Sequence, residues 1–327
     1  MTLPIALDAM GGDYAPAEIV AGARRAVDEL GLRVTLVGVP ELIGDPMGLE
    51  VVACSEVIAM DDDPAASVRT KKDSSLVRAA ELVRDAKASA MVSAGNTGAT
   101  MAAALLRMGR LPGVIRPCIA IPLPNPGTHP SILVDAGANA ECTPEMLVQF
   151  ATMGATFAAA HYAVSDPSVG LLSIGEESSK GTPLVKATHE LLASSGLRFA
   201  GNVEGRDLVP CPVDVVVTDG FTGNVALKTL EGALKFVFST MLSVFGTDDE
   251  TRAAGDSLLP HLMPVVKSLT PENQGGAMLL GLKGICVISH GSSNATAVMN
   301  ALRVAAEMDD AHVVNRLQLA IRPDKSE

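Results

Sequence analysis

The sequence contains no tryptophan, and aromatic residues make up only 3% of its 327 residues. Proteins that bind single-stranded nucleic acid stack bases on aromatic side chains, so this composition argues against such a role. Basic residues are outnumbered as well, since 25 Lys and Arg against 37 Asp and Glu leave a net charge of −12. A local basic patch is still compatible with this balance, but general binding to polyanions is not. No nucleic acid partner is expected.

Cysteine is sparse and shows no pairing pattern. None of the five cysteines belongs to a CxxC motif: Cys54, Cys118, Cys142, Cys211 and Cys286. An odd, scattered set is typical of reduced and mostly buried thiols in a cytosolic protein, and it argues against a structural zinc site. No metal is expected.

Long apolar runs and targeting signals are also missing. No run approaches the ~20 apolar residues that span a bilayer. The chain passes straight into an apolar segment at residues 3–7, without a basic n-region or a cleavage site. These absences predict a cytoplasmic protein that is not integral to a membrane.

Short apolar runs alternate with amphipathic stretches through the whole chain, and 48% of the residues are hydrophobic. Strands are predicted at residues 5–8, 34–38, 51–53, 90–93, 118–122, 132–135, 169–174, 213–218 and 285–289. The stretches between them have apolar residues spaced by three and four, which predicts helices. Thr143 and Thr182, each followed by proline, are expected to cap helices. The alternation predicts an α/β fold with a mainly parallel sheet covered on both faces.

The chain is expected to form a single unit over residues 1–327, because no repeat or low-complexity linker divides it. Within that unit we expect two lobes, roughly residues 1–145 plus 285–327, and residues 146–284.

Six of the predicted strands are followed by small polar residues and then by a helix. These loops are residues 8–13, 93–98, 135–139, 175–181, 219–224 and 290–294. Glycines allow a close approach of backbone to ligand, and a helix N-terminus attracts anions. One such loop is usually only a tight turn. Six loops that converge on one edge of a sheet would favour an anion site.

The usual nucleotide signatures are missing from these loops. There is no GxGxxG motif, and residues 175–181 resemble a P-loop only superficially, because Lys180 precedes the last glycine. Neither a mononucleotide nor a dinucleotide site is supported.

Clustered charges allow two interpretations each. Asp61, Asp62 and Asp63 precede Pro64, which favours a solvated helix cap over the acid–base work that paired carboxylates can do. Glu176 and Glu177 follow a strand, where an internal ion pair with Lys180 and acid–base work are both possible. The basic residues are either a docking patch for an anionic partner or a solvated helix face: Arg69, Lys71, Lys72 and Arg78.

One histidine differs from the others. His290 ends the predicted strand 285–289 and directly precedes a Gly-Ser-Ser helix start, which suggests a site role, with a buried structural histidine as the alternative. The remaining histidines stand in ordinary helix or loop contexts: His129, His161, His189, His261 and His312.

Residues 233–245 are apolar over an unusually wide arc. Their polar residues form a narrow stripe of Lys235, Ser239 and Ser243. An arc this wide is expected to be covered, by the core, by a second subunit or by lipid.

Read together, these loops resemble the bacterial phosphate acyltransferases of phospholipid synthesis. The resemblance rests on motifs that occur in order from residue 3 to about residue 305: residues 5–13, 71–75, 93–98, 135–139, 175–181, 219–228 and 284–293. It implies a three-layer α/β/α fold similar to that of isopropylmalate dehydrogenases and phosphotransacetylases.

The resemblance implies transfer of a long-chain acyl group from acyl-carrier protein to inorganic phosphate, which gives acyl phosphate for phosphatidic acid synthesis. It also implies a homodimer without metal or nucleotide cofactor. Peripheral membrane contact is implied too, beside a membrane-bound glycerol-3-phosphate acyltransferase as the next enzyme.

Phosphate is itself the nucleophile in this reaction, so the site has to orient an anion and stabilise an oxyanion. The residues expected to act in catalysis are His290, Lys180 and Asn224. Those expected to bind phosphate or substrate are Asp8, Gly11, Gly12, Ser93, Gly95, Asn96, Thr97, Gly98, Asp135, Asn139, Glu176, Gly220, Gly223, Lys228, Ser292 and Ser293. Docking of the carrier protein is assigned to Arg69, Lys71 and Lys72.

Two tracts depart from the family pattern: residues 273–278 differ from a Tyr-Gly-Gly-Ala-Pro type of tract, and Asn294 stands where Asp is frequent. Two other functions also need weighing. A decarboxylating dehydrogenase would need several Asp for Mg²⁺ and a nicotinamide pocket, for which the sequence offers no convincing set. An inert scaffold for carrier protein and membrane would have no need of Asn, Lys and His at strand ends.

Overall fold

The computed structural model describes residues 3–125, 128–269 and 275–321. Its strands form one sheet in the order β3-β2-β1-β4-β11-β10-β5-β6-β9-β7-β8. The strands are β1 (Ile5–Asp8), β2 (Val34–Gly38), β3 (Glu50–Ala53), β4 (Ala90–Ser93), β5 (Cys118–Leu123), β6 (Ser131–Val134), β7 (Ser168–Ser173), β8 (Arg198–Glu204), β9 (Val215–Val217), β10 (Ala277–Leu280) and β11 (Ile285–Ile288).

Helices cover both faces of this sheet, as predicted. The helices are α1 (Ala17–Leu30), α2 (Pro40–Ile43), α3 (Pro64–Thr70), α4 (Ser75–Arg84), α5 (Thr97–Arg107), α6 (Pro144–His161), α7 (Pro183–Ala193), α8 (Gly220–Phe245), α9 (Asp249–Leu269), α10 (Ala295–Asp310) and α11 (Val313–Ile321). One hydrophobic core joins the sheet to α1, α6, α7, α10 and α11, and the other joins it to α3, α4, α5 and α8. Side chains alternate between these cores along each strand, which explains why the strands are apolar throughout.

Every predicted strand is present within one or two residues, but β8 and β10 were missed. β8 is an edge strand with a polar, glycine-containing sequence. β10 has only four residues, and it directly follows Gly275 and Gly276, whose positive φ angles resemble a turn signal. Asn273 and Gln274 of the divergent tract lie outside the described residues.

Strand direction reverses inside the sheet. β10 is antiparallel to both β11 and β5, and β5 forms an antiparallel pair with β6. Consequently β1 to β5 and β11 run one way, whereas β6 to β9 and β10 run the other way. The sheet is continuous across the expected lobe boundary, and the division into lobes stays a prediction.

Local signals fixed the helix starts. The side chains of Thr143 and Thr182 accept hydrogen bonds from the third residue of α6 and α7, and Asp63 caps α3 in the same way. The caps predicted at the two threonines are therefore confirmed, and within the Asp61–Asp63 tract the cap role belongs to Asp63. All five cysteines are free thiols, and only Cys142 is not fully buried.

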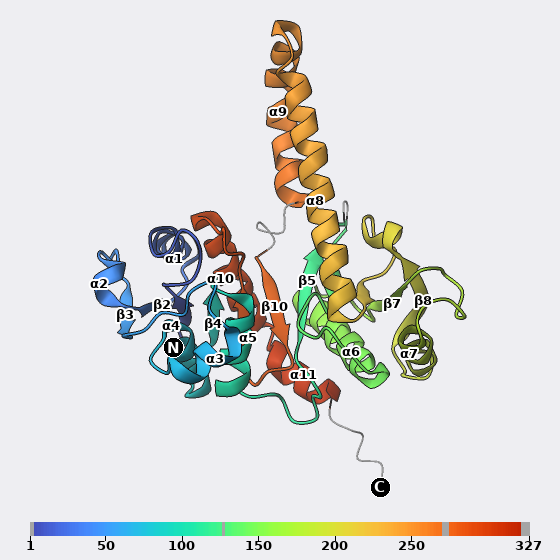
Figure 1. Cartoon of the computed structure of the whole chain (residues 1–327), viewed down its shortest axis with the longest axis horizontal. Coiled ribbons are helices and arrows are strands. Elements are labelled where there is room, and N and C mark those ends of the chain that lie inside the picture. The colour runs from blue at the N-terminus through green and yellow to red at the C-terminus, as the bar shows by residue number, and fades with distance from the viewer. Residues whose placement is uncertain (1–2, 126–127, 270–274, 322–327) are drawn as a thin grey trace.

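Helices α8 and α9 pack against each other and project from the body of the protein (Figure 1). Exposed apolar side chains remain along α8, with Phe236 70% and Val237 59% exposed, and along α9, with Val265 54% exposed. Residues 233–245 were predicted to be covered by the core, by a second subunit or by lipid. For the exposed positions, the prediction that they lie in the core of this chain is wrong. A second subunit or lipid remains.

The first turn of α8 is seated tightly on the loop that follows β6. A Cβ atom added at Gly223 would overlap the carbonyl oxygen of Asp135, and one added at Gly220 would come within 2.6 Å of the Asn139 oxygen. We expect Gly223→Ala to lower the free energy of unfolding by at least about 2 kcal/mol, because two backbone segments would have to separate.

Gly232→Ala on the same helix is the matched control, because its new Cβ would meet no atom within 4 Å. The control should raise the free energy of unfolding by up to about 1 kcal/mol through helix propensity. Urea unfolding of the two variants measures both effects. If Gly223→Ala is as stable as the wild type, α8 is not seated as described.

Candidate functional site

The six polar loops form two clusters instead of one. The loops after β1, β4 and β11 lie at one end of the strands, which we call the Asp8 edge of the sheet, and together they form the Asp8 cluster. The loops after β6, β7 and β9 lie at the opposite edge, and we call them the Asp135 cluster. The prediction that all six converge on one edge is wrong, because the β5–β6 pair reverses the chain. Four strand spacings separate Ser93 from Asp135, or roughly 20 Å in a flat sheet.

Asp8 holds the Asp8 cluster closed. Its carboxylate is fully buried and accepts hydrogen bonds from the Ser93 hydroxyl at 2.7 Å and from the Met10 amide at 3.1 Å. Burial raises the pKa of this carboxyl, and hydrogen bonds from Ser75 and Ser93 oppose the shift. A Cβ at Gly11 would lie 2.6 Å from both the Asp8 carboxylate and the Gly95 nitrogen. The loops after β1 and β4 are therefore in direct contact at Gly11 and Gly95.

Asn96 is also occupied within the protein. Its side-chain oxygen accepts the Ala99 amide at 3.0 Å and caps α5, while its nitrogen donates to the Met60 carbonyl at 2.8 Å. Gly98, two residues further, packs against Pro64. Both predicted phosphate contacts thus have structural partners, and only Thr97 of this loop is exposed.

His290 is the open group of the Asp8 cluster. Its Nδ1 atom accepts the Ser292 amide at 3.2 Å and lies 2.8 Å from the Ser292 hydroxyl. In the neutral ring, Nε2 therefore carries the proton. The Ser293 hydroxyl donates to the His290 carbonyl at 2.6 Å, and Asn294 caps α10. The side chain is exposed, so the alternative of a buried histidine is wrong.

Asp135 organises the other cluster. Its buried carboxylate accepts the amides of Ile119 at 2.9 Å, Ala138 at 3.0 Å and Asn139 at 2.8 Å, and also the Asn139 side chain at 2.9 Å. Burial raises the pKa of Asp135, and these hydrogen bonds oppose the shift. The Asn139 carbonyl in turn accepts the Gly220 amide at 2.8 Å, which attaches α8 to the loop.

Lys180 and Asn224 are exposed side-chain hydrogen-bond donors of the Asp135 cluster, and we call them the open donors. Both side chains are exposed and have no hydrogen-bond or ion-pair partner among the residues that the structure describes. The Lys180 stem packs over Gly175, and Asn224 lies over Gly137. Because β7 and β9 are parallel neighbours, the loops that carry these donors are adjacent.

Two charged residues in and near the cluster form ion pairs on the surface. The Lys228 ammonium lies 2.8 Å from Glu231, and Glu176 lies 3.9 Å from Arg206. Surface pairs of this kind contribute little to stability. The predicted ion pair between Glu176 or Glu177 and Lys180 is not found in the described part of the chain.

The same loops and the first turns of α8 carry exposed apolar side chains that were not predicted from the sequence. Ile174 is 81% exposed, Phe221 is 66% exposed and Val225 is 50% exposed. Phe221 directly follows Gly220, and an aromatic residue inside a glycine-containing loop was the available signal. The Asp135 cluster therefore combines hydrogen-bond donors with an exposed apolar surface.

The predicted docking residues lie at the Asp8 edge, before α4. The Lys71 ammonium is engaged by the Asp62 carboxylate at 2.5 Å and by the Val57 carbonyl at 2.9 Å. Arg69 and Lys72 are exposed and carry no partner in the described residues. The docking prediction thus depends on these two side chains.

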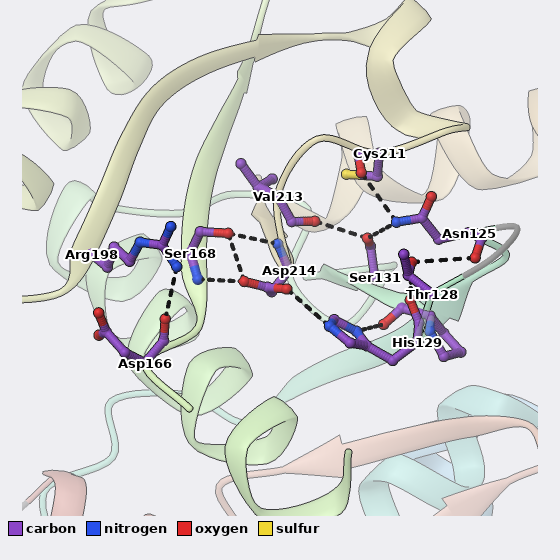
Figure 2. A network of polar contacts seen from close by, with 11 residues as sticks. Asn125, Thr128, His129, Ser131, Asp166, Ser168, Arg198, Cys211, Val213 and Asp214 are labelled. Carbon is purple, nitrogen blue, oxygen red and sulfur yellow. Dashed lines mark hydrogen bonds and ion pairs between the residues drawn. The ribbon is translucent and has the colours of Figure 1, made fainter. Parts of the chain in front are cut away.

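A polar network ties the start of β6 to β7 and β9 (Figure 2). The Asp214 carboxylate accepts the Ser168 amide at 2.7 Å and its hydroxyl at 2.6 Å, and it lies 3.1 Å from Nε2 of His129. Nδ1 of His129 lies 3.1 Å from the Pro130 carbonyl. Both ring nitrogens are thus used in structure, in line with the ordinary role expected for this histidine. In the part of the chain described, no three His, Cys, Asp or Glu side chains are grouped as a metal site requires.

Comparison with known proteins gives a match over nearly the whole chain. The fatty acid synthesis protein family matches residues 3–316. A phosphate acyltransferase of Elusimicrobium minutum is 46% identical over 323 residues, covering 96% of this chain and 94% of its own. The phosphate acyltransferase of Leptospira biflexa is 46% identical over 324 residues, covering 96% and 95%.

Solved structures share the fold at low identity. A phosphotransacetylase from Streptococcus pyogenes aligns with a TM-score of 0.63 and 17% identity, covering 96% of this chain and 94% of its own. A branched-chain phosphotransacylase from Enterococcus faecalis gives 0.61 and 15%, covering 93% and 99%. The phosphotransacetylase type of fold is confirmed.

Proposed function

The chain belongs to the fatty acid synthesis protein family of phosphate acyltransferases, and on that premise we propose which of its residues carry out the reaction. Its activity is that of a phosphate acyltransferase of fatty acid and phospholipid synthesis, which forms acyl phosphate. For the acyl donor we propose a long-chain thioester of acyl-carrier protein, and for the acceptor inorganic phosphate.

The transfer needs few functional groups from the protein. A phosphate oxygen attacks the thioester carbon, the carbonyl oxygen becomes an oxyanion, and the carbon–sulfur bond breaks to release the carrier thiol. A thiolate with a pKa of about 8.5 leaves readily, so strong acid assistance is unnecessary. The protein has to hold the phosphate anion, stabilise the oxyanion and accommodate the acyl chain.

We place this chemistry at the Asp135 cluster, with Lys180 as the phosphate-binding cation and Asn224 as the oxyanion donor. The observation that carries the proposal is the combination of these two open donors with the exposed apolar side chains of Ile174, Phe221 and Val225. The two open donors suit the phosphate anion, and the exposed apolar side chains suit the long acyl chain.

The buried carboxylates have a different task in this proposal. Asp8 and Asp135 accept hydrogen bonds from their own loops, and a carboxylate repels phosphate. Both therefore position the loops instead of binding substrate. The predicted phosphate contacts of Gly220 and Gly223 become packing contacts that hold α8, and with it Asn224, in place.

For His290 we propose a donor role through its free Nε2–H. It lies at the opposite edge from Lys180 within one chain, so it reaches the same substrate only if a second copy brings its Asp8 edge alongside. The homodimer that the family resemblance implies provides such a copy.

The projecting helices α8 and α9 are proposed as the surface that associates with this second copy. In the described part of the chain no helix is both long and apolar enough to span a bilayer. Peripheral contact with a membrane, and with a membrane-bound glycerol-3-phosphate acyltransferase, is the further proposal for apolar surface that the dimer leaves open.

Lys180→Ala and Asn224→Ala are each expected to lower kcat/KM by at least about a hundredfold, as the loss of one preorganised donor does. The melting temperature should hardly change, because neither side chain has a partner in the folded chain. The assay follows carrier thiol released from palmitoyl-carrier protein with phosphate, together with product trapped by hydroxylamine. Lys186→Ala, an exposed lysine of α7, is the control. Normal turnover by both variants would remove the reaction from the Asp135 cluster.

His290→Ala is expected to lower kcat/KM by at least about a hundredfold with an unchanged melting temperature, because it removes an exposed donor and no buried contact. The same thiol-release assay, paired with thermal unfolding on one preparation, measures both. A variant with near-normal turnover would confine catalysis to Lys180 and Asn224. Parallel loss of stability and activity would mean that the ring only holds the α10 loop.

Phe236→Asp is expected to leave the fold intact and to weaken dimerisation at least tenfold, because it places a charge on an exposed apolar face. The same substitution at Phe238, which is half-buried, would test the packing of α8 instead of its exposed face. Ser239→Asp adds the same charge on the polar stripe and should leave the association unchanged. Sedimentation measures the dimer and co-flotation with vesicles measures lipid binding. A Phe236→Asp variant that stays dimeric but leaves the vesicles would assign this face to lipid.

A further inference from the structure

Two hollows meet at the C-terminal ends of α4 and α5, away from the Asp135 cluster but at the same edge of the sheet. Their volumes are about 280 and 420 Å³, and Val83 and Lys283 line both. Apolar side chains form the floor, including Met108, Ile285 and Met308. Because the two hollows share Val83 and Lys283, we treat them together as the Lys283 groove, which has buried apolar side chains at its base and polar groups over more than half of its exposed lining.

Cations form the rim of the Lys283 groove. Arg84 and Arg107 stand in the last turns of α4 and α5, and Lys283 is exposed between the hollows. Glu81 is shared by these two arginines, at 3.6 Å from Arg84 and 3.8 Å from Arg107, so it does not neutralise both. The Nε atom of Arg107 is buried without a hydrogen-bond partner in the described residues.

Acidic groups also border the groove and reduce its charge. Asp85 binds Arg84 at 2.7 Å, and Asp309 lines the first hollow. Lys283 has no ion-pair partner among the described residues, and Lys87 is exposed nearby on the chain. On a chain with a net charge of −12, Lys283 is one of the exposed lysines without an ion-pair partner in the described residues, as Lys72 and Lys180 also are. An apolar floor with a cationic rim fits the amphipathic face of an acidic helix.

The position of the groove relates it to the proposed reaction centre. Cys286 of β11 lies beside Leu279 of β10, Leu279 lies beside Ile119 of β5, and Ile119 lies beside Asp135 just after the end of β6. Cys286 and Asp135 are therefore at the same height in the sheet. Lys283 is three residues before Cys286 and three strands away from β6, which corresponds to roughly 17 Å in a flat sheet. The strand before Lys180, β7, is five strand spacings from β11, or roughly 24 Å. The extended prosthetic arm of a carrier protein covers the first of these distances. The Lys71 patch, by contrast, lies at the opposite edge of the sheet.

We propose that the Lys283 groove docks the acyl-carrier protein through an acidic, amphipathic helix, so that its thioester reaches Lys180 and Asn224. This inference rests on the proposed function, since it takes the carrier thioester as the substrate. It moves the docking surface from Lys71 and Lys72 to the edge of the sheet that holds the Asp135 cluster.

Lys283→Glu and Arg84→Glu, singly and together, test the groove in the full-length protein. Kinetics are measured with the same acyl group on carrier protein and on free pantetheine, which lacks the protein partner. We expect the KM for the carrier thioester to rise at least tenfold in the double variant and the KM for the pantetheine thioester to stay within twofold. The wild-type KM for the carrier thioester should also rise with salt, and that of the double variant should not.

Lys72→Glu is the matched control, because it reverses one exposed charge at the opposite edge. Binding of fluorescently labelled carrier protein, followed by anisotropy, gives a readout that does not depend on activity. If the double variant does not fold, Lys283→Glu alone is used in both measurements. Equal effects on both thioesters, or carrier binding lost in Lys72→Glu and kept in Lys283→Glu, would overturn the groove. Failure of the proposed function is distinguishable, because the wild type would then release thiol from neither thioester.

Discussion

The buried carboxylate of Asp135 holds together the junction on which the rest of the structure depends. It accepts amides from β5 and from its own loop, and that loop supports the first turn of α8. The β5–β6 pair that it terminates is also the place where the sheet reverses direction. A carboxylate without these donors would be costly to bury. The hydrogen bonds therefore join two oppositely directed halves and orient Asn224 at the same time.

Reversal of the sheet separates the loops into two groups with different chemistry. In the Asp8 cluster, many polar atoms are used by neighbouring loops, whereas Nε2 of His290 has no partner in the described residues. At the Asp135 edge, the carboxylate is internal but Lys180 and Asn224 point to open surface beside apolar side chains. Similar glycine-rich sequences thus serve as rigid junctions in one place and as donor platforms in another. What distinguishes them is whether the side chains find partners inside the protein.

Apolar surface is unevenly distributed over the molecule. The sheet buries both of its faces, as an α/β protein requires, whereas α8 and α9 project from the body of the protein (Figure 1) and keep large apolar side chains exposed. Exposed apolar area of this kind marks an association surface. Because α8 begins at the Asp135 cluster and ends far from the sheet, one helix connects the proposed reaction centre to the proposed contact with a second copy or a membrane.

The sequence by itself determined the α/β class, the strands that precede polar loops, the caps at Thr143 and Thr182, and the family. These features depend on local periodicity, local capping and ordered motifs, all of which are written along the chain. Only the tertiary structure decided which strands are neighbours and which way each one runs, because an apolar run looks the same in either direction. Nor does the sequence tell whether a polar atom is satisfied by a partner far along the chain, as the Ser93 hydroxyl satisfies Asp8. The separation of His290 from Lys180 and Asn224 follows from pairings between strands far apart in the chain, and no local pattern encodes it.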